Sequence, residues 1–180
     1  MSKKQKGRIW TFAILGVLLA LILAVVLSSP LLRPPAGPTP LEIGFTALDG
    51  RRLLTSDGDF RGKVVLVDLM AANCPPCNAE MPELLAFRES VRGLDVELIS
   101  LSIWVGQGLG EDVEDLQAFR TFWGSDWTFG VPDDTLSLVV EYQVQFPPFK
   151  LLLDRDGQLV WTRPGETSSD VLLAAVNEAL

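Results

Sequence analysis

The sequence contains no histidine, and Cys74 and Cys77 are its only two cysteines among 180 residues. A closed zinc or iron–sulfur site needs about four nitrogen or sulfur ligands, which this chain does not carry. A copper(I) ion held linearly by the two thiols, or a metal site shared between chains, stays open as an interpretation. No cysteine lies near the end of the N-terminal apolar run, which excludes a lipid-modified cysteine at that point.

Basic side chains are scarce outside the N-terminus. Residues 1–33 contain five lysines and arginines and no acid, so the remaining chain carries −13 while the whole chain carries −8. Proteins that bind nucleic acid neutralise its phosphates with clustered Lys and Arg. An acidic domain of this kind excludes nucleic acid as a partner.

A long apolar run without a single charge occupies residues 9–27. As a helix it reaches about 28 Å, close to the hydrocarbon thickness of a bilayer. The basic cluster before it predicts a cytoplasmic tail at 1–8, a single-pass membrane anchor at 9–28, and a domain outside the cytoplasm. The alternative is a cleaved signal peptide, because small residues follow the run. Its length, beyond the usual ~7 to 15 residue signal core, favours the retained anchor.

The part of the chain after the anchor divides into a tether and a domain. Residues 29–40 are rich in proline and lack hydrophobic periodicity, which predicts a semi-rigid, extended tether. Residues 41–180 are enough for one globular domain with a real core.

Hydrophobic periodicity and turn residues predict the elements of this domain. Hairpins are predicted at 41–55 and at 149–163, where the second turns at Asp156-Gly157. Buried strands are predicted at 63–70 and 95–103, and helices at 75–92, 111–123, 134–142 and 168–180. Strands that alternate with helices predict an α/β fold with a central mixed sheet flanked by helices.

The spacing of the two cysteines allows a structural or a redox role. As a structural disulfide the pair would close the shortest practical loop, so it would stabilise the fold little. As a redox pair, Cys74 lies at the start of the helix predicted from Pro75, where unpaired N–H groups stabilise a thiolate. Cys77 follows one turn later on the same side, more covered than Cys74, and would resolve the mixed disulfide. Pro76 removes an N–H that could otherwise bond the sulfur.

The stretch VVLVDLMAANCPPCNAEMP, residues 64–82, resembles the active-site stretch of the thioredoxin superfamily, especially its membrane-anchored TlpA/ResA/CcmG-type members. The likeness covers roughly residues 41–180, including an N-terminal β-hairpin extension. It implies a thioredoxin-like fold and an extracytoplasmic thiol–disulfide oxidoreductase that reduces protein disulfides, with cytochrome c maturation as one setting. It also implies a disulfide-bearing protein substrate, a membrane thiol donor, and no cofactor besides the redox-active disulfide Cys74–Cys77.

A second stretch, YQVQFPPFKLLLD at 142–154, is similar to the segment in which this superfamily carries a cis-proline facing the disulfide. The match makes Pro148 the cis-proline and gives Pro147 and Pro148 a role in substrate binding. Pro147 has no N–H to offer a substrate, but its carbonyl remains. The alternative is an ordinary trans turn.

Two acids accompany the cysteines. Asp68 stands where thioredoxins carry a buried acid, and an ionised carboxylate is poorly solvated in an apolar strand, which suits it to proton exchange with Cys77. The alternative is a solvated aspartate at the end of a strand. Glu80 follows Cys77 by one turn and matches an acid that the superfamily uses near the active site; the alternative is an ordinary acid in the first turn of a helix.

Asn73 replaces the tryptophan that usually precedes the first cysteine in these relatives, which affects substrate docking. Loops after parallel strands gather at one edge of a sheet, so residues 104–110, with Trp104, are predicted to lie near Cys74 and to contact substrate. A thiol peroxidase or a copper metallochaperone on the same fold is the alternative function. The stretch before Cys74 offers neither the threonine nor the arginine typical of the first, and the chain has no histidine, which is typical of the second. A scaffolding domain would leave the cysteines unexplained.

Overall fold

The computed structural model describes residues 16–20 and 40–180, and the chain divides into two compact units at residues 39 and 40. Residues 16–20 are helical. No helix within the two described ranges combines the length and the apolar character needed to cross a membrane. Most of the predicted anchor at 9–28, and the predicted tether at 29–40 apart from its last residue, lie outside the described residues.

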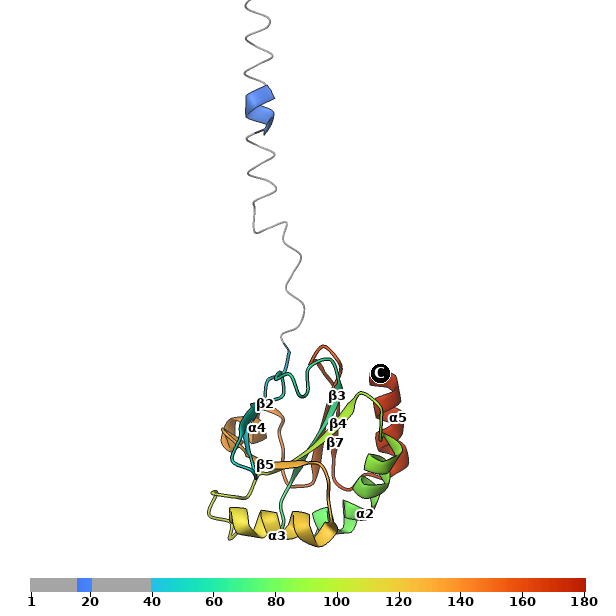
Figure 1. Cartoon of the computed structure of the whole chain (residues 1–180). Helices are drawn as coiled ribbons and strands as arrows, with labels where there is room; N and C mark the ends of the chain where they lie inside the picture. Colours follow the sequence, from blue (N-terminus) through green and yellow to red (C-terminus); the bar gives the residue numbers. More distant parts are fainter. Residues whose placement is uncertain (1–15, 21–39) are drawn as a thin grey trace, which may run out of the picture. The chain divides into compact units, whose positions relative to one another are not determined.

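The second unit is built on one mixed sheet of seven strands, in the order β2-β1-β5-β4-β3-β6-β7 (Figure 1). β3 and β4 run parallel, as do β4 and β5, whereas the remaining neighbours are antiparallel. The strands are β1 (Gly44–Ala47), β2 (Arg52–Leu54), β3 (Val64–Met70), β4 (Val96–Ser102), β5 (Thr128–Pro132), β6 (Phe149–Leu153) and β7 (Leu159–Pro164).

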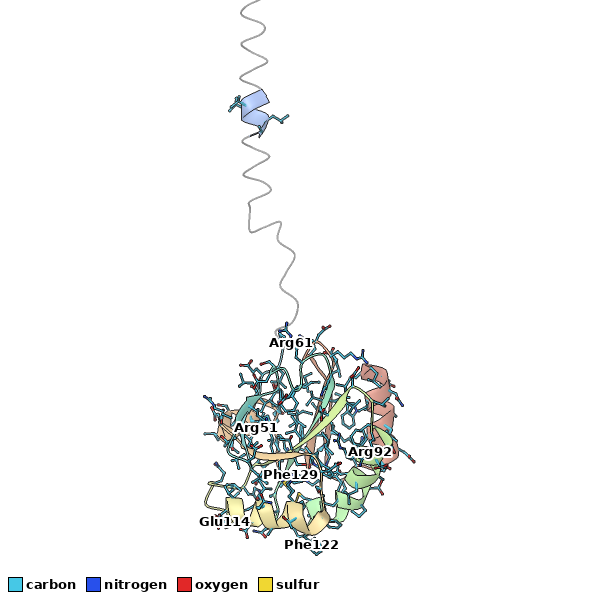
Figure 2. The ribbon with its side chains drawn as sticks, viewed as in Figure 1. Arg51, Arg61, Arg92, Glu114, Phe122 and Phe129 are labelled. Carbon is cyan, nitrogen blue, oxygen red and sulfur yellow. A yellow bond between two sulfur atoms is a disulfide. The ribbon has the colours of Figure 1, made fainter. Side chains whose placement is uncertain are left out.

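Helices cover both faces of the sheet because the central strands are apolar on both sides. Alternate residues of β3 point to opposite faces. One set packs with α2 (Pro75–Ser90), α3 (Val113–Trp123) and α5 (Ser169–Ala179), and the other with α4 (Thr135–Glu141). Figure 2 shows Phe122 on the outer side of α3, where it is 80% exposed, while Phe129 points into the domain.

The predicted elements are confirmed, with ends that differ by a few residues, and one strand is missing from the prediction. β5 is short and contains Gly130 and Pro132, which are unfavourable in isolated strands. It forms because β4 and β1 flank it. A Cβ on Gly130 would lie 2.6 Å from the carbonyl oxygen of Thr46, so the close approach of β1 requires glycine here.

Three segments meet at one edge of the sheet. β3 and β4 are parallel, so Asn73 and the loop 104–110 follow them at the same edge. β6 runs antiparallel to β3 and begins there, because Phe149 pairs with Leu69. The Pro147–Pro148 segment therefore lies at the edge where α2 starts.

Candidate active site

The two cysteines form a disulfide at the start of α2. Cys74 is the N-cap residue, and the N–H of Cys77 donates a hydrogen bond to Cys74 Sγ at 3.2 Å. Pro75 and Pro76 occupy the next positions, where the missing N–H groups would have had no partner within the helix. The sequence therefore specifies locally both the start of the helix and the position of Cys74.

Both cysteines of the disulfide are buried. Cys74 and Cys77 are each 2% exposed, so the prediction that Cys77 is the more covered of the two is wrong. Cys74 Sγ lies 3.6 Å from the carbonyl oxygen of Pro147, and Trp104 and Val105 belong to the same packed cluster. A disulfide sulfur has no hydrogen to donate, so this oxygen contact becomes a hydrogen bond only after reduction to the thiol.

The Pro147–Pro148 peptide bond is cis, as the sequence predicts, and the alternative of a trans turn is wrong. The carbonyl of Pro148 accepts the N–H of Gly165 at 2.8 Å, which ties this segment to the end of β7. The geometry thus brings the predicted Pro147 and Pro148 beside Cys74.

Asn73 connects the cysteines with the loop after β4. Its backbone N–H donates to Glu111 Oε2 at 3.1 Å, and its side-chain amide donates to the carbonyl of Gly110 at 3.3 Å. The other oxygen of Glu111 accepts the Ser102 hydroxyl at 2.5 Å. Trp104 is half-buried and packs against both core clusters. The predicted position of the 104–110 loop near the cysteines is confirmed.

A polar layer lies in the sheet beneath α2. Asp68 pairs in register with Ser100 on β4 and with Lys150 on β6, so the three residues occupy one level of three neighbouring strands. Leu66 and Met70, two residues to either side of Asp68, pack on the face that α2 covers. Asp68 is 1% exposed, and Ser100 and Lys150 are fully buried. The alternative of a solvated aspartate at the end of a strand is wrong.

Glu80 completes this layer from α2. It is 2% exposed, its Oε1 accepts the N–H of Thr167 at 2.7 Å, and its Oε2 accepts a hydrogen bond from Lys150 Nζ. The same ammonium lies 3.4 Å from Asp68 Oδ1, an oxygen without a hydrogen-bond partner among the described residues. Ser100 donates to Asp68 Oδ2 at 3.0 Å. Lys150 therefore joins two buried carboxylates, and Glu80 is not an ordinary acid of the first helical turn.

Burial, and after it the negative charge of Asp68, raises the pKa of Glu80 from 4.5 to about 7. The ammonium of Lys150 and the N–H of Thr167 act in the opposite direction. Glu80 follows Cys77 by three residues in α2, so both side chains lie on the same side of the helix. Near neutral pH, this carboxyl group can both take up and release a proton close to the disulfide.

Lys150 and Glu111 are absent from the sequence-based prediction. Lys150 interrupts the otherwise apolar run from Phe149 to Leu153, and a single charge inside a buried strand was the signal that could have identified it. Glu111 follows a loop that contains three glycines, and nothing in its sequence neighbourhood indicates burial. Both residues become visible only through contacts distant in the chain.

The sheet topology, the disulfide at the start of α2 and the cis-proline beside it define a protein of the thioredoxin superfamily, and its similarity to ResA makes it TlpA/ResA-like. The family model described as Redoxin matches residues 38–178, well over half of the chain. The chain belongs to the Redoxin family, and the protein is an oxidoreductase.

Curated relatives and solved structures agree with this assignment. The thiol-disulfide oxidoreductase ResA of Geobacillus kaustophilus is 28% identical over 161 residues, which cover 87% of each chain. ResA of Bacillus cereus is 26% identical over 128 residues, 71% of this chain and 68% of the relative.

Among solved structures, dsbF of MTB has a TM-score of 0.64 at 22% identity and covers 81% of this chain and 100% of its own. A thiol-disulfide oxidoreductase from Bacteroides fragilis has a TM-score of 0.65 at 17% identity, covering 79% and 100%. At these identities the structures support the fold.

Proposed function

We propose that this protein is a membrane-tethered, extracytoplasmic thiol–disulfide oxidoreductase that reduces disulfides of protein substrates with the Cys74–Cys77 dithiol. The observation that carries the proposal is the position of this disulfide, at the N-cap of α2 and on the helix side that carries a proton-exchanging carboxyl group. The relatives named ResA support the thiol–disulfide chemistry.

The reaction runs through one mixed disulfide. The Cys74 thiolate attacks a sulfur of the substrate disulfide, the substrate S–S bond breaks, and one substrate sulfur leaves and takes up a proton. Cys77 then loses its proton, attacks Cys74 Sγ, and releases the second substrate sulfur, which is also protonated. The substrate gains two electrons and two protons, and Cys74 and Cys77 become the disulfide. A membrane thiol donor returns the two electrons and two protons.

The substrate segment lies across Asn73, Trp104 and the Pro147–Pro148 segment. Asn73 is exposed beside the disulfide, and the Pro147 carbonyl is directed to Cys74 Sγ at 3.6 Å. Pro147 has no N–H, so its carbonyl is the group that can accept an N–H of the substrate backbone. Apocytochrome c before haem attachment is a substrate of this kind.

Two features favour the reducing direction, because both disfavour a thiolate and thereby lower the reduction potential. Pro75 and Pro76 contribute no N–H, which leaves the Cys77 N–H as the donor to Cys74 Sγ from the first turn. Beneath the cysteines, the one ammonium of Lys150 faces two carboxyl groups, Asp68 and Glu80, so no positive charge is left over to stabilise a thiolate.

The first prediction concerns the reduction potential of the Cys74/Cys77 couple. We expect ~−270 mV or lower for the full chain, measured in mild detergent by equilibration with thiol buffers and trapping of free thiols. A potential near ~−120 mV would contradict the reducing direction and indicate an enzyme that makes disulfides. Absence of a reversible couple would overturn the proposed function.

The second prediction concerns the anchor at 9–28. In a bacterial host, we expect the full-length chain to stay in the membrane fraction after an alkaline carbonate wash, because the apolar run is long enough to span the bilayer. Protease added to spheroplasts should digest the domain while a cytoplasmic marker survives. As a control, arginines in place of Leu18 and Ile22 should release the chain from the membrane. A shortened chain in the soluble fraction would instead indicate a cleaved signal peptide.

A further inference from the structure

Lys150 lies within the stretch 142–154 that contains the cis-proline but has no predicted role there, yet it is the cation that contacts both buried carboxylates. It lies two residues after Pro148 on β6, fully buried, with Asp68 facing it from β3 and Glu80 from α2. Arg163 is its register partner on β7 and is exposed. Cys77 lies on the same side of α2 as Glu80.

The charges of this cluster do not balance. Two carboxylates share a single ammonium away from water, and a buried charge without a partner is strongly unfavourable. One of the two carboxyl groups is therefore easily protonated, while the ammonium stabilises the other as a carboxylate. A methionine at position 150 would fill a similar space without the cost of burying a charge. What the lysine contributes beyond packing is control over which carboxyl group is ionised.

Starting from the proposed function, we propose that Lys150 is a positioning residue of the thiol exchange, whose ammonium holds a carboxylate of the Glu80 and Asp68 pair ionised to receive the Cys77 proton. In the second step, the Cys77 S–H bond breaks and its proton moves to this carboxylate. The Cys77 thiolate then attacks Cys74 Sγ, and the substrate sulfur leaves with the electron pair of the broken S–S bond. Without the ammonium, which lowers the pKa of Glu80, this carboxyl group holds its proton more tightly and is less often free to accept another.

The test separates the two thiol steps in the full chain, kept in mild detergent. Reduced protein is mixed with an excess of the aromatic disulfide DTNB, which releases one coloured thiolate when Cys74 attacks and a second when Cys77 resolves the mixed disulfide. The rate of the second release is followed from about pH 5 to about pH 9. For the wild-type protein, we expect the rate of the second release to rise with pH and to reach half of its maximum near the Glu80 pKa of about 7.

The Lys150→Met variant should keep the first release and move the midpoint of the second upward by at least about one pH unit, which makes this step about fivefold slower at neutral pH. Lys63→Met is the matched control. Lys63 precedes β3 and pairs with Glu97 at 2.7 Å, at the end of the strand opposite to the disulfide. We expect this control to retain the wild-type midpoint.

A second comparison covers the case in which Lys150→Met does not fold. Glu80→Gln leaves Lys150 and Asp68 as a one-to-one pair. In this background, adding Lys150→Met should again move the pH midpoint of the second thiolate release upward. An unchanged midpoint on removal of Lys150, in either background, overturns the proposal and makes the lysine structural. A wild-type protein that releases only one thiolate, or none, would contradict the proposed function instead.

Discussion

Replacement of Cys74 by serine will abolish disulfide reduction by this protein, with a loss of at least about a thousandfold in the rate of substrate reduction. Cys74 occupies the N-cap of α2, and its sulfur accepts the Cys77 N–H, so its thiolate is the nucleophile that begins the exchange. A serine hydroxyl in the same place cannot form the mixed disulfide. The measurement is the rate at which a protein disulfide is reduced under excess donor thiol.

Cys77→Ser is the matched variant, because it removes the other sulfur of the same disulfide. It should still attack the substrate once and then remain covalently attached to it, which non-reducing electrophoresis and mass determination would show. If Cys74→Ser forms the stable adduct and Cys77→Ser does not, the roles of nucleophile and resolving thiol are reversed.

The second large effect is on stability as a function of pH. The pKa of Glu80 is about 7 in the folded protein and ordinarily 4.5, so the folded state binds the proton more tightly than the unfolded state. A raised pKa contributes stability that is complete below about pH 4.5 and is lost as the pH rises through about 7. We expect the wild-type free energy of unfolding to fall by on the order of 3 kcal/mol across this window, relative to Glu80→Gln.

The measurement is urea unfolding of residues 40–180, which form one compact unit, followed by tryptophan fluorescence at several pH values. Glu83→Gln is the matched control on the same helix. Glu83 also accepts a backbone N–H, that of Ser169 at 2.8 Å, but it lies outside the cluster of Asp68 and Lys150. In this control, the free energy of unfolding should depend on pH as it does in the wild-type protein. If the free energy of unfolding of Glu80→Gln depends on pH in the same way as that of the wild-type protein, Glu80 does not titrate between about pH 4.5 and about pH 7.

Most of the fold could be predicted because its signals are local. An unbroken apolar run predicts β3, and prolines at the start with a glycine after the end predict α2. Asp-Gly turns mark both hairpins. β5 could not be predicted, because five residues that include Gly130 and Pro132 have little preference for a strand. Its pairing with β4 and β1 stabilises it, and this pairing exists only in the assembled sheet.

The candidate site divides in the same way. Cys74, Cys77, Asp68, Glu80 and Pro148 follow from motifs, but the motifs say nothing of what surrounds them. The equal burial of the two cysteines depends on the approach of Pro147, which precedes β6, and on the packing of Trp104 and Val105 after β4. The pKa of Glu80 likewise depends on groups from other elements.

The sequence by itself determined the apolar N-terminal run, the acidic domain, the order of most elements, and the helix start at which Cys74 lies. These features depend on residues that are neighbours in the chain. Only the tertiary structure decided that Lys150 stands between Asp68 and Glu80, because the pairing of β3 with β6 and the packing of α2 bring the three together. Burial then makes their charges interact strongly, since little water remains to screen them.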